Sequence, residues 1–397
     1  MRTGTNTKGR AIALISLMTV LTASSTQLQA DTGECGGQMI TLPFKDVPAA
    51  NIFFCSIAEA FFSGLTNGTS PTTYNPSDPV PREQMAAFIT RTMDQSVTRS
   101  SKRAALDQYW TTRANLAVTD VGGGPSLVKS DGLDLWVANS ISGTVSRIRA
   151  SDGTLLQTWT GATGAFGVLC AAGKVFVTGM TSPGSLYQID PTQPVGAVTT
   201  LSSALGDEPL GISYDGQRIW TANFSGSVSI VTLNPVAVTN VSTGFNSLAG
   251  VVYDGTNIWV TDQGDNMLKK LDSTGSVVLP ISVGTAPLFL AFDGTNLWVP
   301  NHSSNTVTVV RAAGDFVGAV LTTATGNGMS GPDSVAFDGE RILVTNEISS
   351  TVSLWKATDF SPIGSVSTGA STSPYGACSD GLNFWITLRG PLKLARY

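Results

Sequence analysis

Asp293-Gly294-Thr295-Asn296-Leu297-Trp298-Val299-Pro300-Asn301 is the clearest copy of a template that this chain repeats at intervals of about forty residues. The template consists of a short apolar strand, Asp-Gly, two residues, an apolar residue, Trp, and a second strand ending in Asn or Asp. The other clear copies run from Asp131 to Asn139, Asp215 to Asn223, Asp254 to Asp262 and Asp338 to Asn346. Two copies are altered: Phe176 replaces the Trp after Gly173, and the copy that begins at Asp380 ends at Leu388.

Each repeat predicts a blade of four short β-strands, because it has four β-rich runs between turn residues and no helical period. A repeat of this length, built only from strands, favours a β-propeller over a helical solenoid. Asp-Gly suits a tight hairpin, since Gly accepts positive φ and Asp tolerates it. In one repeat we expect strands at Leu288 to Phe292, Leu297 to Pro300, Thr306 to Arg311 and Phe316 to Thr322.

The repeated aromatic and amide residues have structural explanations. One blade cannot bury both of its faces, so the tryptophans are expected to fill the layers between blades. The Asn and Asp residues that end the second strands recur too regularly for a specific site, and we expect them to bond the backbone of their own turns. The tryptophans concerned are Trp136, Trp220, Trp259, Trp298 and Trp385.

The two ends of the repeat array predict how the ring closes. The last repeat stops after its third strand at Tyr397, whereas an unpaired strand from Leu116 to Val121 precedes the first repeat. We therefore expect this strand to complete the seventh blade, which leaves no open sheet edge. The predicted fold is all-β, a seven-bladed β-propeller over residues 115–397.

Three segments resemble a known family. Trp136-Val137-Ala138-Asn139, Leu343-Val344-Thr345-Asn346 and Val283-Gly284-Thr285-Ala286-Pro287 are similar to the YVTN-type repeats of bacterial seven-bladed propellers. The likeness extends from about Leu116 to the end of the chain. It implies the fold and leaves binding, scaffolding and enzymatic functions open.

The N-terminus predicts export. Arg2, Lys8 and Arg10 precede an apolar run from Ala11 to Ala23, and a small-residue stretch ends near Ala30. This pattern is typical of a secretory signal peptide over residues 1–30. Its removal changes the formal net charge from −5 to −8. The acidic chain has no basic nucleic-acid footprint, and no later segment has the length of a transmembrane helix.

The four cysteines predict one disulfide in the exported protein. Cys35 and Cys55 lie in a small region with little core of its own, so we expect them to pair. Cys170 and Cys378 belong to the second and seventh blades, and we expect buried free thiols there. Because the chain has no Cys-x-x-Cys pair, a cysteine metal site is not expected.

The region from residue 31 to 97 predicts a small helical module, followed by a linker over residues 98–114. Helical spacing indicates two short helices, one within Ile52 to Phe62 and one ending near Met93. Phe44-Lys45-Asp46-Val47 and Tyr74-Asn75-Pro76 resemble the S-layer homology module, whose members hold anionic cell-wall polymers. The resemblance implies wall binding through Arg82, while an ordinary local ion pair of Arg82 remains the alternative.

The propeller sequence offers little catalytic chemistry. The predicted inner strands contain two charged residues, Lys129 and Asp333, whereas a hard divalent cation prefers several carboxylates. Lactonase-like and streptogramin-lyase-like propellers use acidic and histidine side chains around the channel, and this chain has one histidine, His302. We therefore expect no catalytic residue, metal or cofactor, and interpret His302 as a turn residue of the rim.

The loops that vary between blades form the candidate binding surface, since loops on a rigid scaffold carry binding residues. We predict an exported cell-envelope or extracellular protein whose propeller binds a protein or envelope glycan. The alternatives are a channel-metal lactonase or lyase, and a structural component of a surface layer. The rim candidates are Asp207, Glu208, Asp262, Asp265, His302, Asn327, Asp333 and Glu347.

Overall fold

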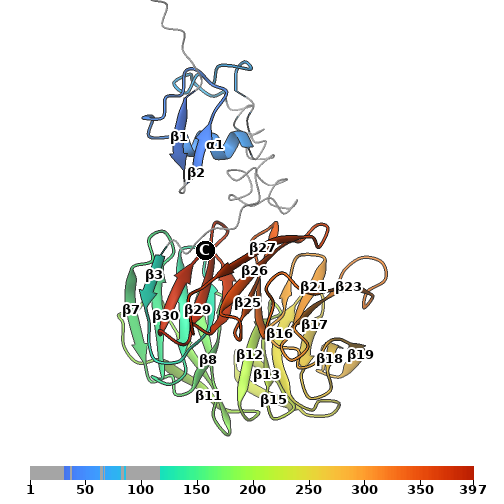
Figure 1. Ribbon diagram of the computed structural model, residues 1–397. Helices are drawn as coiled ribbons and strands as arrows, with labels where there is room; N and C mark the ends of the chain where they lie inside the picture. The colour runs from blue at the N-terminus through green and yellow to red at the C-terminus, as the bar shows by residue number, and fades with distance from the viewer. Residues whose placement is uncertain (1–30, 36–37, 63–65, 67, 82–84, 86–116) are drawn as a thin grey trace, which may run out of the picture.

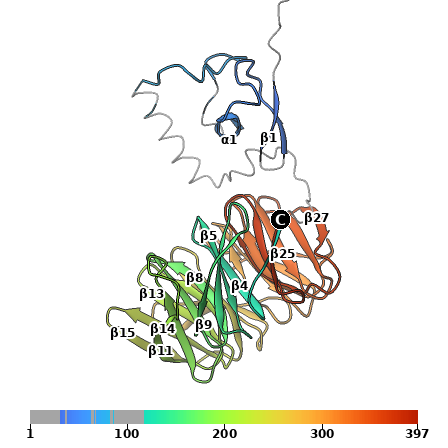
Figure 2. The ribbon, with the colours of Figure 1, turned by 90° about the vertical axis from the view of Figure 1, so that its left-hand side faces the viewer.

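The repeats form seven antiparallel sheets of four strands each, arranged as a ring (Figure 1), so the predicted seven-bladed β-propeller is confirmed. The structure, a computed structural model, describes residues 31–35, 38–62, 66, 68–81, 85 and 117–397. Figure 2 gives the view at 90°, in which β4 and β5 of the first blade lie close to β8 and β9 of the second.

Blades are numbered here in chain order, and each runs from an inner to an outer strand. Blades 1 to 3 consist of β4 (Pro125–Ser130), β5 (Asp134–Asn139), β6 (Thr144–Arg149) and β7 (Leu155–Thr160); β8 (Ala165–Ala171), β9 (Lys174–Gly179), β10 (Gly184–Ile189) and β11 (Thr199–Leu205); and β12 (Pro209–Tyr214), β13 (Arg218–Asn223), β14 (Ser227–Leu233) and β15 (Val236–Val241). Blades 4 and 5 consist of β16 (Leu248–Tyr253), β17 (Ile258–Asp262), β18 (Met267–Leu271) and β19 (Val277–Ser282); and β20 (Ala291–Phe292), β21 (Asn296–Asn301), β22 (Thr306–Arg311) and β23 (Val320–Ala324). Blades 6 and 7 consist of β24 (Pro332–Phe337), β25 (Arg341–Asn346), β26 (Thr351–Lys356) and β27 (Pro362–Ser367); and β28 (Pro374–Ser379), β29 (Phe384–Leu388), β30 (Lys393–Arg396) and β3 (Ala117–Asp120).

Blade 5 departs from its predicted strands. Its inner strand β20 has only two residues, because the preceding backbone bonds to blade 6: Phe289 N–H donates to Asp333 O, and Val335 N–H donates to Phe289 O. The outer strand begins at Val320 rather than at Phe316, since Phe316 has a φ of 61° and lies in a turn. The bonds between the two inner strands hold Asp333 in the wall of the ring axis.

Ring closure occurs as predicted. β3 pairs antiparallel with β30, with Ala117 opposite Arg396 and Asp120 opposite Lys393. Figure 1 shows the early strand β3 beside β30 at the other end of the colour scale. An ion pair of 2.7 Å between Lys393 Nζ and Asp120 Oδ1 adds to this closure. The first and last strands of the propeller thus belong to one sheet.

The Asp of the repeat binds the Trp of the same repeat. In blade 5, Asp293 Oδ1 accepts the backbone N–H groups of Thr295 and Asn296, and Oδ2 accepts the indole N–H of Trp298 at 2.9 Å. Gly294 has a φ of 91°, so only the Gly of the pair uses positive φ, whereas the Asp acts through its carboxylate. The same Asp–Trp bond, 2.7–2.9 Å long, joins Asp131 to Trp136, Asp215 to Trp220, Asp254 to Trp259 and Asp380 to Trp385.

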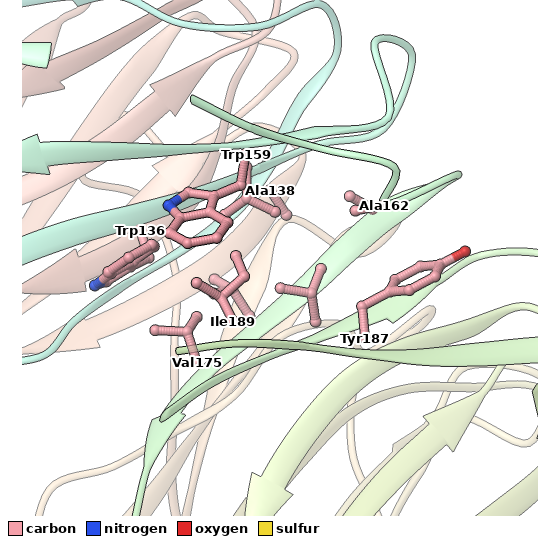
Figure 3. Packing of buried hydrophobic residues seen from close by; sticks show 11 residues of the cluster. Trp136, Ala138, Trp159, Ala162, Val175, Tyr187 and Ile189 are labelled. Atoms are coloured by element: carbon pink, nitrogen blue, oxygen red, sulfur yellow. The ribbon is translucent and has the colours of Figure 1, made fainter. Parts of the chain in front are cut away.

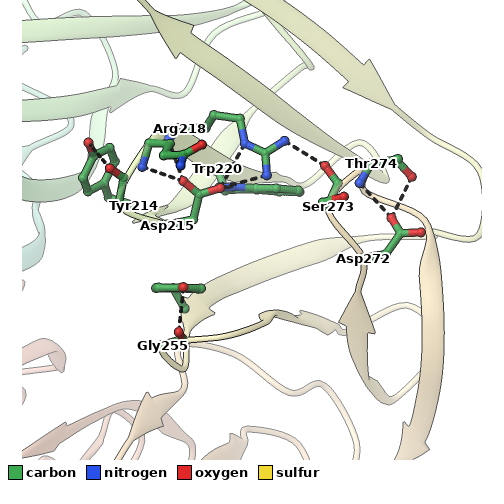
Figure 4. A network of polar contacts seen from close by, with 11 residues as sticks. Tyr214, Asp215, Arg218, Trp220, Gly255, Asp272, Ser273 and Thr274 are labelled. Carbon is green, nitrogen blue, oxygen red and sulfur yellow. Dashed lines mark hydrogen bonds and ion pairs between the residues drawn. The ribbon is translucent and has the colours of Figure 1, made fainter.

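The five tryptophans are fully buried, which confirms that they are core residues. Figure 3 shows Trp136 of blade 1 in the layer that it shares with Val175 and Tyr187 of blade 2. Polar contacts join neighbouring blades as well. In Figure 4, Arg218 of blade 3 bonds both Asp215 and the carbonyl oxygen of Ser273 in blade 4.

The residues that end the second strands are structural, but the partners of the asparagines differ from the expected ones. Asn301 Nδ2 donates to the hydroxyls of Thr306 and Thr308 on the third strand, not to the backbone of its turn. In blade 4, Lys269 takes the place of such a hydroxyl and contacts both Asp262 and Asp265. Asp262 also accepts the backbone N–H of Asp265 in its own turn, so the predicted bond to the turn backbone is present at Asp262.

The N-terminal region contains one helix in its described residues, α1 (Phe54–Phe62), after a hairpin of β1 (Thr32–Cys35) and β2 (Gln38–Thr41). The first predicted helix, within Ile52 to Phe62, is confirmed by α1, whereas the prediction of a helical module did not include the hairpin. β1 alternates exposed and buried residues, a pattern of period two that is typical of a half-buried strand. Cys35 and Cys55 form the predicted disulfide, and Cys170 and Cys378 are free. The predicted signal peptide, linker and Arg82 lie outside the described residues, and of the predicted second helix only its start up to Met85 is described in part. No helix of the described part is long and apolar enough to cross a membrane.

Removal of β3 should destabilise the propeller. A chain that begins at Gly122 loses the fourth strand of blade 7 and exposes the edge of β30, whereas a chain that begins at Ala114 keeps β3. We expect the shorter chain to melt at a lower temperature or to associate through the exposed edge. Calorimetry and light scattering on the two chains measure this difference, and identical melting of two monomers would contradict the closure.

Asp293→Ala should destabilise the propeller by about 2–4 kcal/mol, because a buried indole N–H and two backbone N–H groups lose their acceptor. Urea unfolding measures the change. Asp152→Ala is the matched control, since Asp152 caps an exposed turn through Thr154 N–H. Equal midpoints for the two variants would show that the Asp–Trp bond is not important for stability.

Candidate functional site

One face of the ring carries a set of seven equivalent residues, one for each blade. Each directly follows the second strand of its blade, and its N–H donates to the backbone carbonyl of a residue that lies shortly before the inner strand. In blade 5 this bond joins His302 N to Ala286 O at 3.0 Å. The seven residues are Ser140, Met180, Phe224, Gln263, His302, Glu347 and Arg389.

The inner strands place a second set of equivalent residues around the axis. One residue of each blade pairs with the last residue of the second strand, and the member of this set is the next residue along the chain. In blade 6, Pro332 pairs with Asn346, and Asp333 follows Pro332. Only Asp333 carries a carboxyl group in this set. The members are Ser126, Phe166, Leu210, Ala249, Leu288, Asp333 and Tyr375.

Aromatic rings close the axis at this face. The rings of Phe166, Phe289 and Tyr375, from blades 2, 5 and 7, have centroids 5.6–6.1 Å apart and contact one another across the channel. Among the residues that line the axis is a further cavity of about 40 Å³, too small for more than a water or two. The axis at this cavity therefore has no room for a small-molecule ligand, and the open part of the axis is its mouth above the aromatic rings.

Three ionisable side chains converge at this mouth. His302 follows β21 of blade 5, Asp333 lies in β24, and Glu347 follows β25 of blade 6. His302 Nε2 lies 3.9 Å from Asp333 Oδ1 and 3.7 Å from Glu347 Oε2. Gly331 packs beside this imidazole, since a Cβ there would lie 3.1 Å from His302 Nε2. The candidate site thus comes from two neighbouring blades.

Asp333 is the most unusual member of the cluster. Its residue is 1% exposed, and its Oδ2 has no hydrogen-bond partner among the described residues. Burial, together with the negative charge of Glu347, raises the pKa of Asp333 to about 8. The carboxyl group therefore keeps its proton at neutral pH.

His302 and Glu347 influence each other in the opposite sense. The polar contact with the Glu347 carboxylate raises the pKa of His302 above its ordinary value. The same contact lowers the pKa of Glu347, and the positive charge of Arg389 acts in the same direction. At neutral pH the mouth thus combines a protonated acid, a carboxylate and an imidazole that can carry charge.

Arg389 completes the ionisable side of the mouth. Its guanidinium lies flat over Tyr375, with Cζ 3.2 Å from the ring centroid, and its Nε donates to Pro125 O at 3.4 Å. Desolvation raises the pKa of Tyr375, so this tyrosine stays neutral. The stacked ring and the carbonyl hold the guanidinium in one orientation.

The other rim candidates do not join this cluster. Asp262 and Asp265 are held by Lys269, and the amide of Asn327 donates to Leu354 O. Asp207 and Glu208 are exposed on the loop before β12 of blade 3. Of the eight candidates, the structure therefore brings together His302, Asp333 and Glu347. His302 also faces two carboxylates and is more than the simple turn residue that its neighbours suggest.

Sequence reasoning missed Arg389, Phe166 and Met180 as site residues. A signal for Arg389 is present in the repeat: it directly follows Leu388, as His302 follows Asn301 and Glu347 follows Asn346. Alignment of the altered seventh repeat with the others would have placed Arg389 in the same ring. Phe166 and Met180 belong to the second repeat, whose missing Asp and Trp obscure the alignment.

The cluster can also hold a metal ion. His302, Asp333 and Glu347 each offer one ligand atom, and these atoms lie within 4.8 Å of one another. One imidazole and two carboxylates form a donor set that suits a divalent transition metal or Mg²⁺ with open coordination positions. The expectation that the inner strands alone supply too few ligands did not take account of the turns that bring in His302 and Glu347.

The fold and the polar mouth define the class of protein, a seven-bladed β-propeller with an ionisable cluster on its axis. No protein-family model matches the chain, and no curated protein matches it in sequence. Among solved structures it is similar to a streptogramin B lyase, with a TM-score of 0.59 and 16% identity over 71% of this chain and 95% of that chain.

Two further solved structures show the same likeness in fold. One is a catalytically inactive histidine-to-alanine variant of virginiamycin B lyase from Staphylococcus aureus with quinupristin; its TM-score is 0.59, at 14% identity over 70% of this chain and 98% of that chain. The other is the WD40 β-propeller domain of Doa1, with a TM-score of 0.60 and 14% identity over 72% and 96%. At these identities the likeness establishes the fold alone.

Asp333 should make stability fall as the pH rises. Its pKa is about 8 in the folded protein, whereas the ordinary value is 3.8. Between these two pH values the folded state therefore binds more protons than the unfolded state. Asp333→Asn removes this titration. The free energy of unfolding of this variant, relative to that of wild type, should therefore be about 1–3 kcal/mol higher at pH 8 than at pH 5. Urea unfolding at both pH values measures the difference. Asp152→Asn is the exposed control, and parallel curves for wild type and Asp333→Asn would contradict the buried acid.

Proposed function

We propose that the propeller binds a small ligand at its axial mouth, over the aromatic rings and against His302, Asp333 and Glu347. The observation that supports this proposal most directly is the buried Oδ2 of Asp333, which has no partner among the described residues although it borders a polar cluster. An unsatisfied buried polar atom costs about 1–3 kcal/mol. At a polar cluster on the axis, a bound ligand that supplies the missing partner would offset this cost.

The protein acts outside the cytoplasm in this proposal, at the cell envelope or beyond it. The disulfide between Cys35 and Cys55 supports an oxidising compartment, in agreement with the signal peptide expected over residues 1–30. The resemblance to the YVTN repeats and to the S-layer homology module belongs to the same proposal. Arg82 would then give the N-terminal module weak, salt-dependent contact with an anionic wall polymer.

The single histidine makes the ligand proposal testable. In the untagged protein, His302 is the only source of imidazole signals, so proton NMR reports directly on the mouth. We expect a subset of compounds from a small-molecule library, or from envelope extracts, to shift these signals in wild type. The same compounds should bind at least ten-fold more weakly to Asp333→Asn. A library in which no compound shifts His302 would contradict a binding function at this mouth.

The second candidate is a metal-dependent lyase or hydrolase, and the observation that favours it is the convergence of three ligand atoms within 4.8 Å. Two proteins of similar fold are named as lyases, and one of them is inactive after replacement of a histidine. A bound divalent cation would supply Lewis-acid polarisation of a carbonyl group. Asp333, His302 and Glu347 would hold the ion.

Metal binding distinguishes the two candidates. Titration calorimetry with Mn²⁺, Zn²⁺ and Mg²⁺ should give stoichiometric binding in wild type and none in His302→Ala if the enzyme candidate is correct. Asp265→Asn is a useful control, because its carboxylate pairs with Lys269 away from the cluster. Equal binding in wild type and His302→Ala, or none in either, would remove the metal-dependent candidate and leave the binding function.

A further inference from the structure

The mouth has a chemically divided rim. On blades 5, 6 and 7 the equivalent positions hold His302, Glu347 and Arg389. On blades 2 and 3 the same positions hold Met180 and Phe224, which are 40% and 44% exposed. An exposed methionine and an exposed phenylalanine thus occupy the equivalent positions of two neighbouring blades, among otherwise polar positions. They form an apolar arc on the opposite side of the ring from the ionisable arc.

The floor of the mouth continues this division. Phe166 and Leu210 lie beneath the apolar arc, in the inner strands of blades 2 and 3, and pack against Phe289. Asp333 and Tyr375 lie beneath the ionisable arc, in blades 6 and 7. A ligand that fills the mouth therefore contacts apolar groups on one side and polar groups on the other.

Arg389 is the side chain of the ionisable arc that is best placed to bind an anionic ligand. No carboxylate of the described residues lies within ion-pair distance of its guanidinium, whereas His302 and Glu347 face each other. Stacking on Tyr375 fixes the plane of the guanidinium before any ligand arrives, so little conformational entropy is lost on binding. A planar, oriented guanidinium pairs best with a carboxylate, which it can bind through two parallel hydrogen bonds.

We propose that the ligand is an amphipathic carboxylate, whose anionic group binds Arg389 and whose apolar or aromatic part lies over Met180, Phe224 and Phe166. This inference rests on the proposed binding function and adds the class of ligand. The buried, unpartnered Oδ2 of Asp333 is an independent sign that the mouth accommodates a polar group. Because Glu347 is already in contact with His302, Arg389 remains available for a charge supplied from outside.

The probe is 4-phenylbutanoate, compared with the neutral 4-phenylbutanamide of the same shape. We expect the acid to shift the imidazole signals of His302 in wild type and to bind at least ten-fold more tightly than the amide. Arg389→Gln should weaken the acid at least ten-fold, to the affinity of the amide, and leave the amide unchanged. Arg389→Lys should give an intermediate affinity, since it keeps the charge and loses the two-point contact.

The apolar arc has its own control. Phe224→Ala should weaken the acid and the amide to the same extent, because it removes apolar contact and no charge. Phe316→Ala is the matched variant, since Phe316 is 85% exposed in the turn before β23 and away from the mouth. Unchanged melting temperatures show that each variant is folded.

Two results would overturn the inference in distinguishable ways. If acid and amide bind wild type equally, or lose affinity equally in Arg389→Gln, the carboxylate assignment is wrong and ligand binding at the mouth still stands. If neither compound shifts His302, the ligand class is wrong, and the library screen with Asp333→Asn then decides separately whether the mouth binds a ligand at all.

Discussion

The bond between an aspartate carboxylate and the indole N–H of the tryptophan five residues later organises this propeller. One oxygen of the carboxylate closes the turn between the first two strands, and the other fixes the tryptophan that separates this blade from the next. A local turn and a layer between blades therefore depend on the same side chain. In blade 6, which lacks the tryptophan, an arginine takes over this role: Arg341 Nε donates to Asp338, and the guanidinium packs over Phe384 of blade 7.

A rigid frame of this kind allows a few positions to differ without loss of the fold. The residue after each second strand is held by the same backbone bond in all seven blades, so its side chain is free to vary. Imidazole, carboxylate and guanidinium groups occupy this position in three consecutive blades. Since the frame fixes their backbones, the groups meet above the axis without any special loop. The chemistry of the mouth is thus a local departure from the repeat.

Much of the fold follows from the sequence, because the Asp-Gly and Trp positions recur at a constant spacing and the unpaired strand before Gly122 matches the missing strand of the last repeat. The site follows less directly. His302, Asp333 and Glu347 can be selected as rim candidates by residue type, but their proximity depends on the curvature of the ring, which a linear pattern does not contain. The short inner strand β20 is similar, since the bonds that Phe289 makes to blade 6 join residues of different repeats. The hairpin of β1 and β2 was missed because two strands of four residues carry too little alternation to be recognised.

The shared sheet of the first and last strands has a consequence for the order of folding. Asp120 and Lys393 are separated by 273 residues, so the seventh blade cannot be completed until nearly the whole chain has been synthesised. Contacts of such high sequence separation slow folding, and until they form the edges of the partial ring are unpaired. Until its last strand is available, the partial ring thus keeps two unpaired sheet edges, which only the complete chain can join.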